Sequence, residues 1–287
     1  MDRITRIPAP QFDLALTLDS GQVFHWNSSG NGFLGTIGDQ PVYLEQRGDA
    51  LLIYPAAAVK ASAHYFSLDH QLAKICASFP DEPVIREAAS SCRGLRIIRQ
   101  PRWECLATFI TSSMKQVVHI RQISRSLRER YGEALRVRGD RLYAFPAAAR
   151  LAATTVKELR ESALGYRAKN LLATARMVAS GAVDLDALAS LPDDELRAAL
   201  CELPGVGPKV ANCVMLFAYE RLSAFPIDVW IERVLRENYF PRRRNPTVGD
   251  LRDFAARHFG PYGGYAQQYL FHHARKRARQ RLSPRPA

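Results

Sequence analysis

LPGVGPKVANC, residues 203–213, places a glycine-rich turn directly in front of a helical pattern. Gly205 and Gly207 permit positive φ and the close approach of another backbone. Pro208 suits the first position of a helix, where its missing N–H is not needed. Because another helical pattern precedes the turn, the stretch predicts two helices joined by a tight hairpin.

The N–H groups of such a turn can bind a phosphate. A hairpin with Gly205, Val206 and Gly207 at its tip would hold one DNA strand without reading its bases. Glycine turns are common, however, and the stretch alone also fits a plain corner between two helices. Lys209 is equally ambiguous when taken alone. It is either an ordinary solvated lysine or a lysine kept near the helix start for a functional role.

The composition favours a polyanionic partner. The chain has 287 residues and a formal net charge of +12, enough length for one large domain or two modest ones. A strongly basic chain favours nucleic acid, although some proteins are basic without binding it. No run approaches the roughly 20 apolar residues of a membrane span, so we expect an intracellular, soluble monomer in the cytoplasm, nucleoid or nucleus.

The cysteines exclude several kinds of site. The five are scattered and odd in number, which argues against a disulfide framework. No CxxC pair occurs, which disfavours a zinc ribbon, and the missing four-cysteine cluster excludes a cysteine-ligated iron–sulfur centre. HExxH and a Walker-type phosphate loop are also missing. We therefore expect no required cofactor.

The N-terminal part of the chain predicts an antiparallel sheet. Turn-forming residues punctuate positions 10–55 and separate short β-prone runs. The runs are VFHW at 23–26, GFLGTI at 32–37, PVYLEQ at 41–46 and ALLIYP at 50–55. Two short helices should follow, over 67–78 and 83–92.

From about residue 100 the pattern becomes helical. Apolar residues recur at helical spacing through residues 104–132. Further helices are expected over about 156–163, 166–180, 185–190, 193–202, 208–220, 229–239, 247–258 and 263–281. The predicted fold class is α+β, with an N-terminal mixed α/β domain over 1–98 and a mainly α-helical domain over 99–287. The basic run at 274–287 predicts a frayed, solvated tail, with phosphate contact as the weaker alternative.

A second stretch, SAFPIDVWIERVLRENYF at 223–240, makes the hairpin more specific when the two are read together. Asp228 precedes a helical pattern, so its simplest role is an N-cap. Taken together, LPGVGPKVANCVMLFA and FPIDVWIERVL resemble the helix–hairpin–helix, Gly/Pro…Asp (HhH-GPD) superfamily of DNA glycosylases. In that pattern a lysine opens the second hairpin helix and an aspartate follows; here Lys209 and Asp228 are 19 residues apart. A lysine at this position resembles the bifunctional members.

Five further segments narrow the resemblance to 8-oxoguanine DNA glycosylase, in that family's order. They are SGQVFHW at 20–26, YFSLD at 65–69, RQPRWECLATFITSS at 99–113, LGYRAKN at 164–170 and YAQQYLF at 265–271. The resemblance implies an enzyme that flips a damaged base out of duplex DNA and excises it.

The resemblance also implies the catalytic roles. Lys209 would attack the sugar C1′ and form a Schiff base, after which β-elimination cuts the strand; only an amine gives an imine. Asp228 would stabilise the positive charge that develops on the sugar while capping its helix. The backbone carbonyl of Gly21 would accept a hydrogen bond from N7–H of 8-oxoguanine and repel the N7 lone pair of guanine. Without the family match, residues 20–22 would be read as an ordinary turn.

The implied base pocket draws on two helices. Phe271 would stack on one face of the base and Cys213 would line the other, although taken alone both are more often core residues. Gln267, four residues before Phe271, would bond the Watson–Crick edge. Trp230 stands where the family usually has a histidine, near the lesion or its 5′ phosphate.

The remaining DNA contacts depart from the family pattern. Tyr166 resembles the wedge that enters the base stack and Arg167 the residue beside the orphaned base, although a Tyr-Arg pair is otherwise unremarkable. Met114 replaces an asparagine and His119 an arginine that read the orphaned cytosine, and methionine cannot donate those bonds. The sequence therefore predicts a weaker preference for cytosine opposite the lesion.

Three alternatives stay open at this point. The family hairpin often holds a structural cation through backbone carbonyls, here those of Cys201, Leu203 and Val206. A related glycosylase that acts on another damaged base is one rival, although the missing cysteine cluster disfavours oxidised pyrimidines and Lys209 disfavours alkylated bases. A non-enzymatic DNA-binding protein is the other rival, and it predicts no special role for Lys209 or Asp228.

Overall fold

The computed structural model describes residues 3–241 and 246–282, and its N-terminal part is a five-stranded antiparallel sheet. The strands are β1 (Thr5–Pro8), β2 (Asn27–Ser29), β3 (Gly32–Ile37), β4 (Gln40–Arg47) and β5 (Ala50–Tyr54), in the order β1-β5-β4-β3-β2. The predicted antiparallel sheet is thus confirmed. The run at 23–26 is not a strand, however, and β1 had not been predicted.

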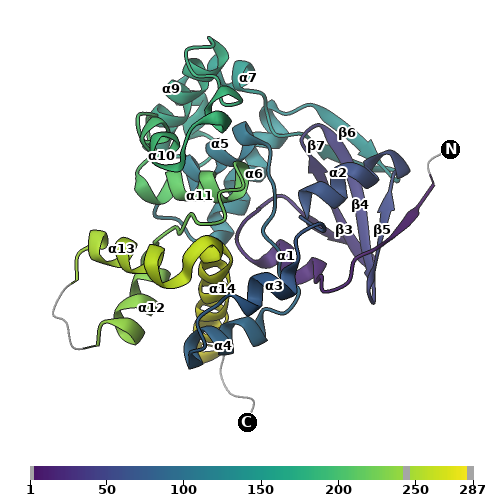
Figure 1. Ribbon diagram of the computed structural model, residues 1–287. Coiled ribbons are helices and arrows are strands. Elements are labelled where there is room, and N and C mark those ends of the chain that lie inside the picture. The colour runs from purple at the N-terminus through teal and green to yellow at the C-terminus, as the bar shows by residue number, and fades with distance from the viewer. Residues whose placement is uncertain (1–2, 242–245, 283–287) are drawn as a thin grey trace.

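Helices accompany the sheet and make up most of the rest of the chain (Figure 1). Those before residue 100 are α1 (Leu14–Asp19), η1 (Ala56–Ala58), α2 (Val59–Tyr65), α3 (Leu72–Ala77) and α4 (Pro83–Ser91). Those after it are α5 (Arg102–Ser112), α6 (Val117–Tyr131), α7 (Ala148–Ala152), α8 (Val156–Arg160), α9 (Arg167–Ala179), η2 (Ala187–Ser190), α10 (Asp193–Cys201), α11 (Pro208–Ala218), α12 (Val229–Tyr239), α13 (Val248–Phe259), η3 (Gly260–Tyr262) and α14 (Gly263–Leu282). The predicted α+β class is confirmed. No helix in the described ranges is both long and apolar enough to cross a membrane.

The helical run predicted over 104–132 is two helices. α5 ends at Ser112 and α6 starts at Val117, and Met114 between them has a φ of 53°. Methionine rarely adopts such a backbone angle, so this loop is locally strained. A hairpin that had not been predicted, β6 (Ala134–Val137) with β7 (Asp140–Tyr143), follows α6 and packs Val137 against Leu34 and Tyr43 of the sheet.

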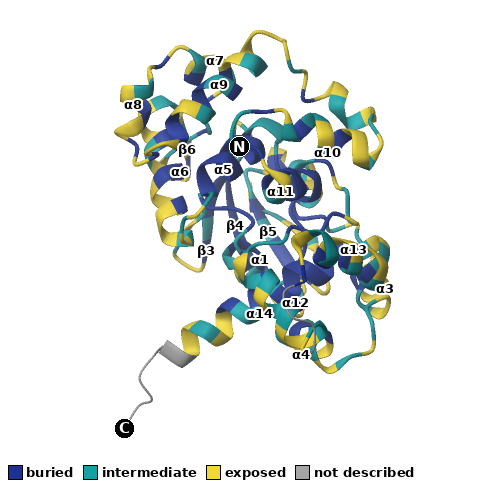
Figure 2. Cartoon of the chain, turned by 90° about the vertical axis from the view of Figure 1, so that its left-hand side faces the viewer, coloured by how far each residue is buried: buried dark blue, intermediate teal, exposed yellow. Residues whose placement is uncertain are grey.

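Two buried clusters hold the fold together. The smaller lies between the sheet and its helices and includes Phe12, Leu44 and Ile53. The larger is helical, and in Figure 2 its α5 and α11 are mostly coloured as buried. Burial of such apolar surface is the main force that stabilises a domain. α3 and α4 contribute to this larger cluster although they precede residue 99, and the domain boundary between 98 and 99 stays a prediction.

A buried polar network joins the sheet to the helices. Glu104 of α5 forms an ion pair with Arg128 of α6, and both side chains are buried. Arg128 also donates to Thr36 Oγ1 of β3 at 2.9 Å. His25 Nε2 lies 2.8 Å from the Thr36 carbonyl oxygen, and its Nδ1 lies 3.4 Å from Glu104. Because the network reaches both halves, it fixes how the sheet sits on α5 and α6.

Candidate functional site

The predicted hairpin is present between α10 and α11. Gly205 has a φ of +85°, and a Cβ placed on it would lie 2.8 Å from the Asn170 Cβ of α9. Only glycine meets both demands without strain. Gly207 differs from the prediction, because its φ is −100° and no heavy atom lies within 4 Å of an added Cβ. Gly207 is the N-cap of α11 and lies at an open surface. A glycine here lets another molecule approach the backbone closely, and no unusual backbone angle requires it.

Lys209 is the second residue of α11. Its Nζ lies over the Phe109 ring of α5, 5.3 Å from the ring centroid, and Lys209 itself is partly buried. Phe109 in turn stacks on Phe217 at 5.5 Å between centroids. The Lys209 side chain therefore packs against the stacked rings of Phe109 and Phe217 instead of extending into solvent.

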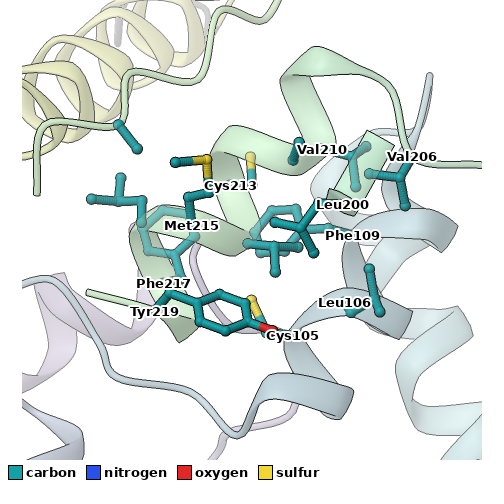
Figure 3. Close-up of a cluster of buried hydrophobic side chains, with 14 of the residues drawn as sticks. Cys105, Leu106, Phe109, Leu200, Val206, Val210, Cys213, Met215, Phe217 and Tyr219 are labelled. Atoms are coloured by element: carbon teal, nitrogen blue, oxygen red, sulfur yellow. The ribbon is translucent and has the colours of Figure 1, made fainter. Parts of the chain in front are cut away.

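Cys213 lies one helical turn after Lys209 and is buried beside it. Figure 3 shows Cys213 and Phe109 among the packed apolar side chains of α5 and α11. Burial raises the pKa of the Cys213 thiol, and a hydrogen bond and positive charge from Lys209 oppose that rise. A thiol held neutral in this way is a polarizable surface for a ring to pack on, not a nucleophile.

Asp228 lies near Lys209 and Cys213. It is the N-cap of α12, and its Oδ1 accepts from the backbone N–H of Trp230 at 3.0 Å and of Ile231 at 2.9 Å. Burial raises the pKa of Asp228, while the Ile231 hydrogen bond and the charge of Lys209 act in the opposite direction. The predicted cap is confirmed, and the effect of the Lys209 charge on the Asp228 carboxyl indicates that these two residues lie near each other.

Gly21 and Phe271 meet on the other side of the site. Gly21 has a φ of +88°, and an added Cβ would lie 3.0 Å from Phe271 Cε1 and 2.8 Å from Arg275 Nη1. A side chain at this position would therefore collide with the two residues of α14. The turn before Gly21 is fixed from the same helix, since Gln268 donates to the Ser20 carbonyl oxygen at 2.8 Å.

Gln267 connects α14 to the segment that carries Asp228. Its Nε2 donates to the Pro226 carbonyl oxygen at 3.0 Å, which orients the amide. Among the described residues, the other amide atom, Oε1, is buried without a hydrogen-bond partner. A buried unpaired acceptor is costly, so a bound group with an N–H donor would be favoured there.

The predicted wedge, Tyr166, lies next to Arg167 and Met114, which were predicted beside the orphaned base. Tyr166 precedes α9 and is 59% exposed, and Met114 is 94% exposed. The Tyr166 hydroxyl lies 4.0 Å from the Met114 sulfur. Arg167 stacks on Tyr166 with its guanidinium carbon 4.3 Å from the ring centroid. Arg167 is itself buried and donates through Nε to the Ser113 carbonyl oxygen at 2.8 Å, so it ties α9 to the loop of Met114.

His119 and Trp230 are less closely joined to these groups. His119 is exposed on the first turn of α6. Trp230 lies on the first turn of α12, where its ring packs under the guanidinium of Arg233 at 5.6 Å. Neither contacts the Lys209 group through its side chain in any interaction recorded for the described residues, although Trp230 is held to Asp228 through its backbone N–H.

The three hairpin carbonyls suit a hard cation chemically. The Leu203 carbonyl oxygen accepts from Val206 N–H at 3.0 Å, which leaves its second lone pair. With the carbonyls of Cys201 and Val206 it would offer three neutral oxygen donors, a set that a hard cation prefers. The described residues contain no cluster of three or more His, Cys, Asp or Glu side chains that could hold a metal.

Sequence reasoning missed two participants in this site. Phe109 lies within the apolar helical pattern at 104–132 and was assigned no role in the site, whereas its ring lies under the Lys209 amine. Arg275 had been assigned to the frayed basic tail, but it is 6% exposed on α14, which continues to Leu282. Residues 283–287 of the predicted tail lie outside the described residues. The spacing of Gln267, Phe271 and Arg275, each four residues apart, was the available signal.

Comparison with known proteins gives the family. A family model described as 8-oxoguanine DNA glycosylase, N-terminal domain, matches residues 4–106. The N-glycosylase/DNA lyase OGG1 of Arabidopsis thaliana is 32% identical over 283 residues, covering 91% of this chain and 77% of the plant protein. The structure of MBOgg1 in complex with a low affinity DNA ligand has a TM-score of 0.91 at 32% identity and covers 96% of each chain.

A third similar protein is the 8-oxoguanine glycosylase/lyase of Clostridium acetobutylicum, solved with double-stranded DNA containing cytosine opposite 8-oxoguanine. Its TM-score is 0.89 at 30% identity, over 97% of this chain and 100% of that one. Matches of this identity span nearly the whole chain. The chain therefore belongs to the 8-oxoguanine DNA glycosylase/lyase family of the helix–hairpin–helix superfamily.

Proposed function

We propose that this chain excises 8-oxoguanine from duplex DNA and then cuts the strand, as a bifunctional glycosylase and lyase. The observation that carries the proposal is the juxtaposition of Lys209, Cys213 and Asp228 at the starts of α11 and α12. A nucleophilic amine next to a fixed carboxylate is what Schiff-base excision needs, whereas a DNA-binding hairpin alone would need neither.

Lys209 supplies the covalent step. Its neutral amine attacks C1′ of the flipped nucleotide, and the bond from C1′ to N9 breaks with its electron pair leaving on the base, which takes up a proton. The sugar ring opens to an imine between Lys209 and C1′. The imine makes the C2′ proton acidic, and its loss expels the 3′ phosphate by β-elimination. No cofactor takes part in these steps.

Asp228 acts as a fixed negative charge. The sugar becomes positively charged as the glycosidic bond breaks, and a carboxylate held by two N–H groups does not have to reorganise to stabilise that charge. Its Oδ1 is occupied by the cap hydrogen bonds, so Oδ2 is the oxygen directed to the sugar. The cap and the catalytic role are thus compatible.

Lesion recognition belongs to Gly21, Phe271, Cys213 and Gln267. The base lies between the Phe271 ring and the Cys213 thiol, and the Gly21 carbonyl accepts from N7–H, which guanine lacks. The unpaired Oε1 of Gln267 accepts from the N–H donors of the Watson–Crick edge. One lost hydrogen bond with an unpaired buried acceptor is worth about 1–3 kcal/mol, so the Gly21 contact contributes roughly 5- to 150-fold in selectivity over guanine.

DNA is held at the exposed surfaces of the same face. The N–H groups around Gly205, Val206 and Gly207 bind the backbone of the lesion strand, and a cation on the Cys201, Leu203 and Val206 carbonyls would stiffen that turn. Tyr166 and Met114 enter the base stack as apolar wedges beside the orphaned base. Arg167 positions this wedge through Ser113, and His119 and Trp230 lie within reach of the backbone. The enzyme is proposed to act as a monomer inside the cell.

Borohydride trapping tests the proposal. The native protein is incubated with an 8-oxoguanine duplex and borohydride, which reduces the imine to a stable covalent adduct. We expect trapping by the native chain and none by Lys209→Gln, which keeps the fold but lacks the amine. An undamaged duplex of the same sequence is the control. Trapping that survives in Lys209→Gln would contradict the nucleophile assignment, and no trapping on any lesion would favour a DNA-binding protein.

A further inference from the structure

The strongest unexplained group outside the assigned residues is the guanidinium of Arg275. Its side chain is 7% exposed, and among the described residues its Nη1 is the only terminal guanidine nitrogen that is buried without a hydrogen-bond partner. A buried cation with two unused N–H donors is expensive to retain. Burial lowers the pKa of Arg275 to about 10, which still leaves it charged at neutral pH.

The position of Nη1 relates it to the base pocket. It lies 2.8 Å from where a Gly21 Cβ would be, and the guanidinium carbon lies 5.4 Å from the Phe271 ring centroid. The other terminal nitrogen, Nη2, donates to the Asp19 carbonyl oxygen, which fixes the group next to the turn of Gly21. Nη1 therefore faces the junction of Gly21 and Phe271, where the proposed function places the imidazole ring of the lesion.

Local charge also favours an electronegative partner. Asp19 is shared by Arg275, by Arg121 at 2.8 Å and by Arg279 at 3.5 Å. One carboxylate facing three guanidinium groups leaves a local excess of positive charge. Because Arg275 is buried, a group that enters the base pocket reaches it more readily than a phosphate at the surface.

The helix supplies a matched pair of unused groups. Gln267, Phe271 and Arg275 are spaced by four residues on one face of α14, and eight residues of helix rise by about 12 Å. Among the described residues, the acceptor Gln267 Oε1 and the donor Arg275 Nη1 are both buried and unpaired, and Phe271 lies midway between the two residues along the helix. A purine stacked on Phe271, with a hydrogen bond at each end, spans a comparable length.

We propose that Arg275 is a specificity-determining residue whose Nη1 donates a hydrogen bond to the C8 oxygen of the flipped 8-oxoguanine. This inference rests on the proposed function. In 8-oxoguanine the N7–H donor and the C8 oxygen acceptor are neighbours, so the Gly21 carbonyl and the Arg275 guanidinium read the two atoms that oxidation changes. Guanine offers neither the N7 hydrogen nor the C8 oxygen.

The test compares duplexes in which a 2′-fluorinated sugar blocks base release. They carry 8-oxoguanine, 8-aminoguanine or a tetrahydrofuran abasic site, and binding is measured for the native protein and Arg275→Met. We expect Arg275→Met to weaken 8-oxoguanine binding on the order of 10- to 100-fold. Its binding of 8-aminoguanine and of the abasic site should not weaken, because an amino group cannot accept from Nη1 and the abasic site has no base.

The matched control is Arg279→Gln, which removes a charge from the same helix and the same partner, Asp19, at an exposed position. It should bind all three duplexes like the native protein. Equal losses on 8-oxoguanine and 8-aminoguanine in Arg275→Met would mean that Arg275 only supports Phe271, and would overturn the proposal.

Abasic-site binding reports whether Arg275→Met is folded. Should that variant fail to fold, the native protein decides with a duplex that carries 8-thioguanine, which keeps N7–H but has at C8 a sulfur that accepts hydrogen bonds only weakly. Equal affinity for 8-oxoguanine and 8-thioguanine would contradict the C8 contact. A native protein that binds 8-oxoguanine no better than guanine, or that gives no trapped adduct, would instead refute the proposed function itself.

Discussion

Asp228 caps α12 and is proposed to supply a catalytic charge, and one substitution alone cannot separate these two roles. Its Oδ1 caps α12 through two backbone N–H groups, and the charge of Lys209 is close enough to lower the pKa of the Asp228 carboxyl against the effect of burial. An asparagine caps a helix about as well as an aspartate, but it carries no charge. An alanine provides neither. The two variants therefore separate stability from chemistry at one position.

We expect Asp228→Asn to keep a native melting temperature and to slow base release on the order of 10²-fold, since only the charge is lost. Asp228→Ala should also lose about 1 kcal/mol of stability with the cap. Thermal unfolding and single-turnover excision measure the two effects. Asparagine and native proteins with equal excision rates would show that the charge has no catalytic role.

In the proposed function, Met114 and His119 are the residues that meet the strand opposite the lesion. Met114 is almost fully exposed at a positive φ, next to Tyr166, and offers a thioether where hydrogen-bond donors would be needed to read cytosine. An apolar side chain can fill space in a base stack regardless of the base it meets. This chemistry predicts a site that tolerates different bases opposite the lesion.

We therefore expect only a weak preference for cytosine opposite 8-oxoguanine. Single-turnover excision from duplexes with C, A, G or T opposite the lesion measures it. Met114→Asn, which restores amide donors at an exposed position, should raise the preference for cytosine. A strong cytosine preference in the native protein would contradict this reading of Met114 and His119.

At the scale of elements, the hairpin uses its two glycines differently. Gly205 has a positive φ and its Cα faces Asn170, whereas Gly207 has an extended backbone and open space beside it. Gly205 is therefore required by the fold, whereas no neighbouring group within the fold requires a glycine at position 207. The group proposed to approach Gly207 is the DNA backbone.

This difference gives a matched pair of variants. Gly205→Ala should destabilise the protein by at least about 1–2 kcal/mol, because the methyl group meets Asn170 at an unfavourable φ. Gly207→Ala should cost less than that, as a slightly poorer N-cap, yet weaken binding to undamaged duplex DNA. Urea unfolding and a duplex-binding titration measure the two outcomes. Unchanged duplex binding by Gly207→Ala would remove the hairpin tip from the DNA interface.

For the whole molecule, burial of histidines links stability to pH. Burial, with Arg128 nearby, holds the pKa of His25 well below its ordinary value of 6.5. Burial and the charge of Arg275 lower the pKa of His272 to about 4. In the unfolded chain both would titrate near 6.5. Between these values the unfolded chain binds more protons, so the stability that these residues contribute is present above pH 6.5 and is lost as pH falls.

We expect the protein to lose stability between pH 7.5 and pH 5, and His272→Gln to lose ~2 kcal/mol less over that interval than the native protein. Urea unfolding at the two pH values measures both changes. Burial raises the pKa of Glu104, and this shift changes stability with pH in the opposite direction. Because Glu104 is present in both proteins, the difference between them reports His272 alone. His64→Gln, at an exposed position, is the control. An identical pH dependence in native protein and His272→Gln would contradict the assignment.

The sequence by itself determined the features that rest on local chemistry. The PGVGPK turn, Pro208 at the helix start and the cap by Asp228 follow from the backbone preferences of single residues, and all are present. The order of sheet and helices follows from hydrophobic periodicity. The Lys209–Asp228 spacing and the dispersed motifs indicated the family before any geometry was known.

Only the tertiary structure decided which distant groups meet. Gly21 and Arg275 are far apart in sequence, and no local pattern predicts that α14 brings the guanidinium against that turn. The same is true of Phe109 under Lys209. A basic run predicts a solvated segment because charge is costly to bury. Arg275 is buried nevertheless, because α14 packs its guanidinium against the Asp19 carbonyl oxygen. Long-range packing, which sequence periodicity does not encode, placed these residues in the site.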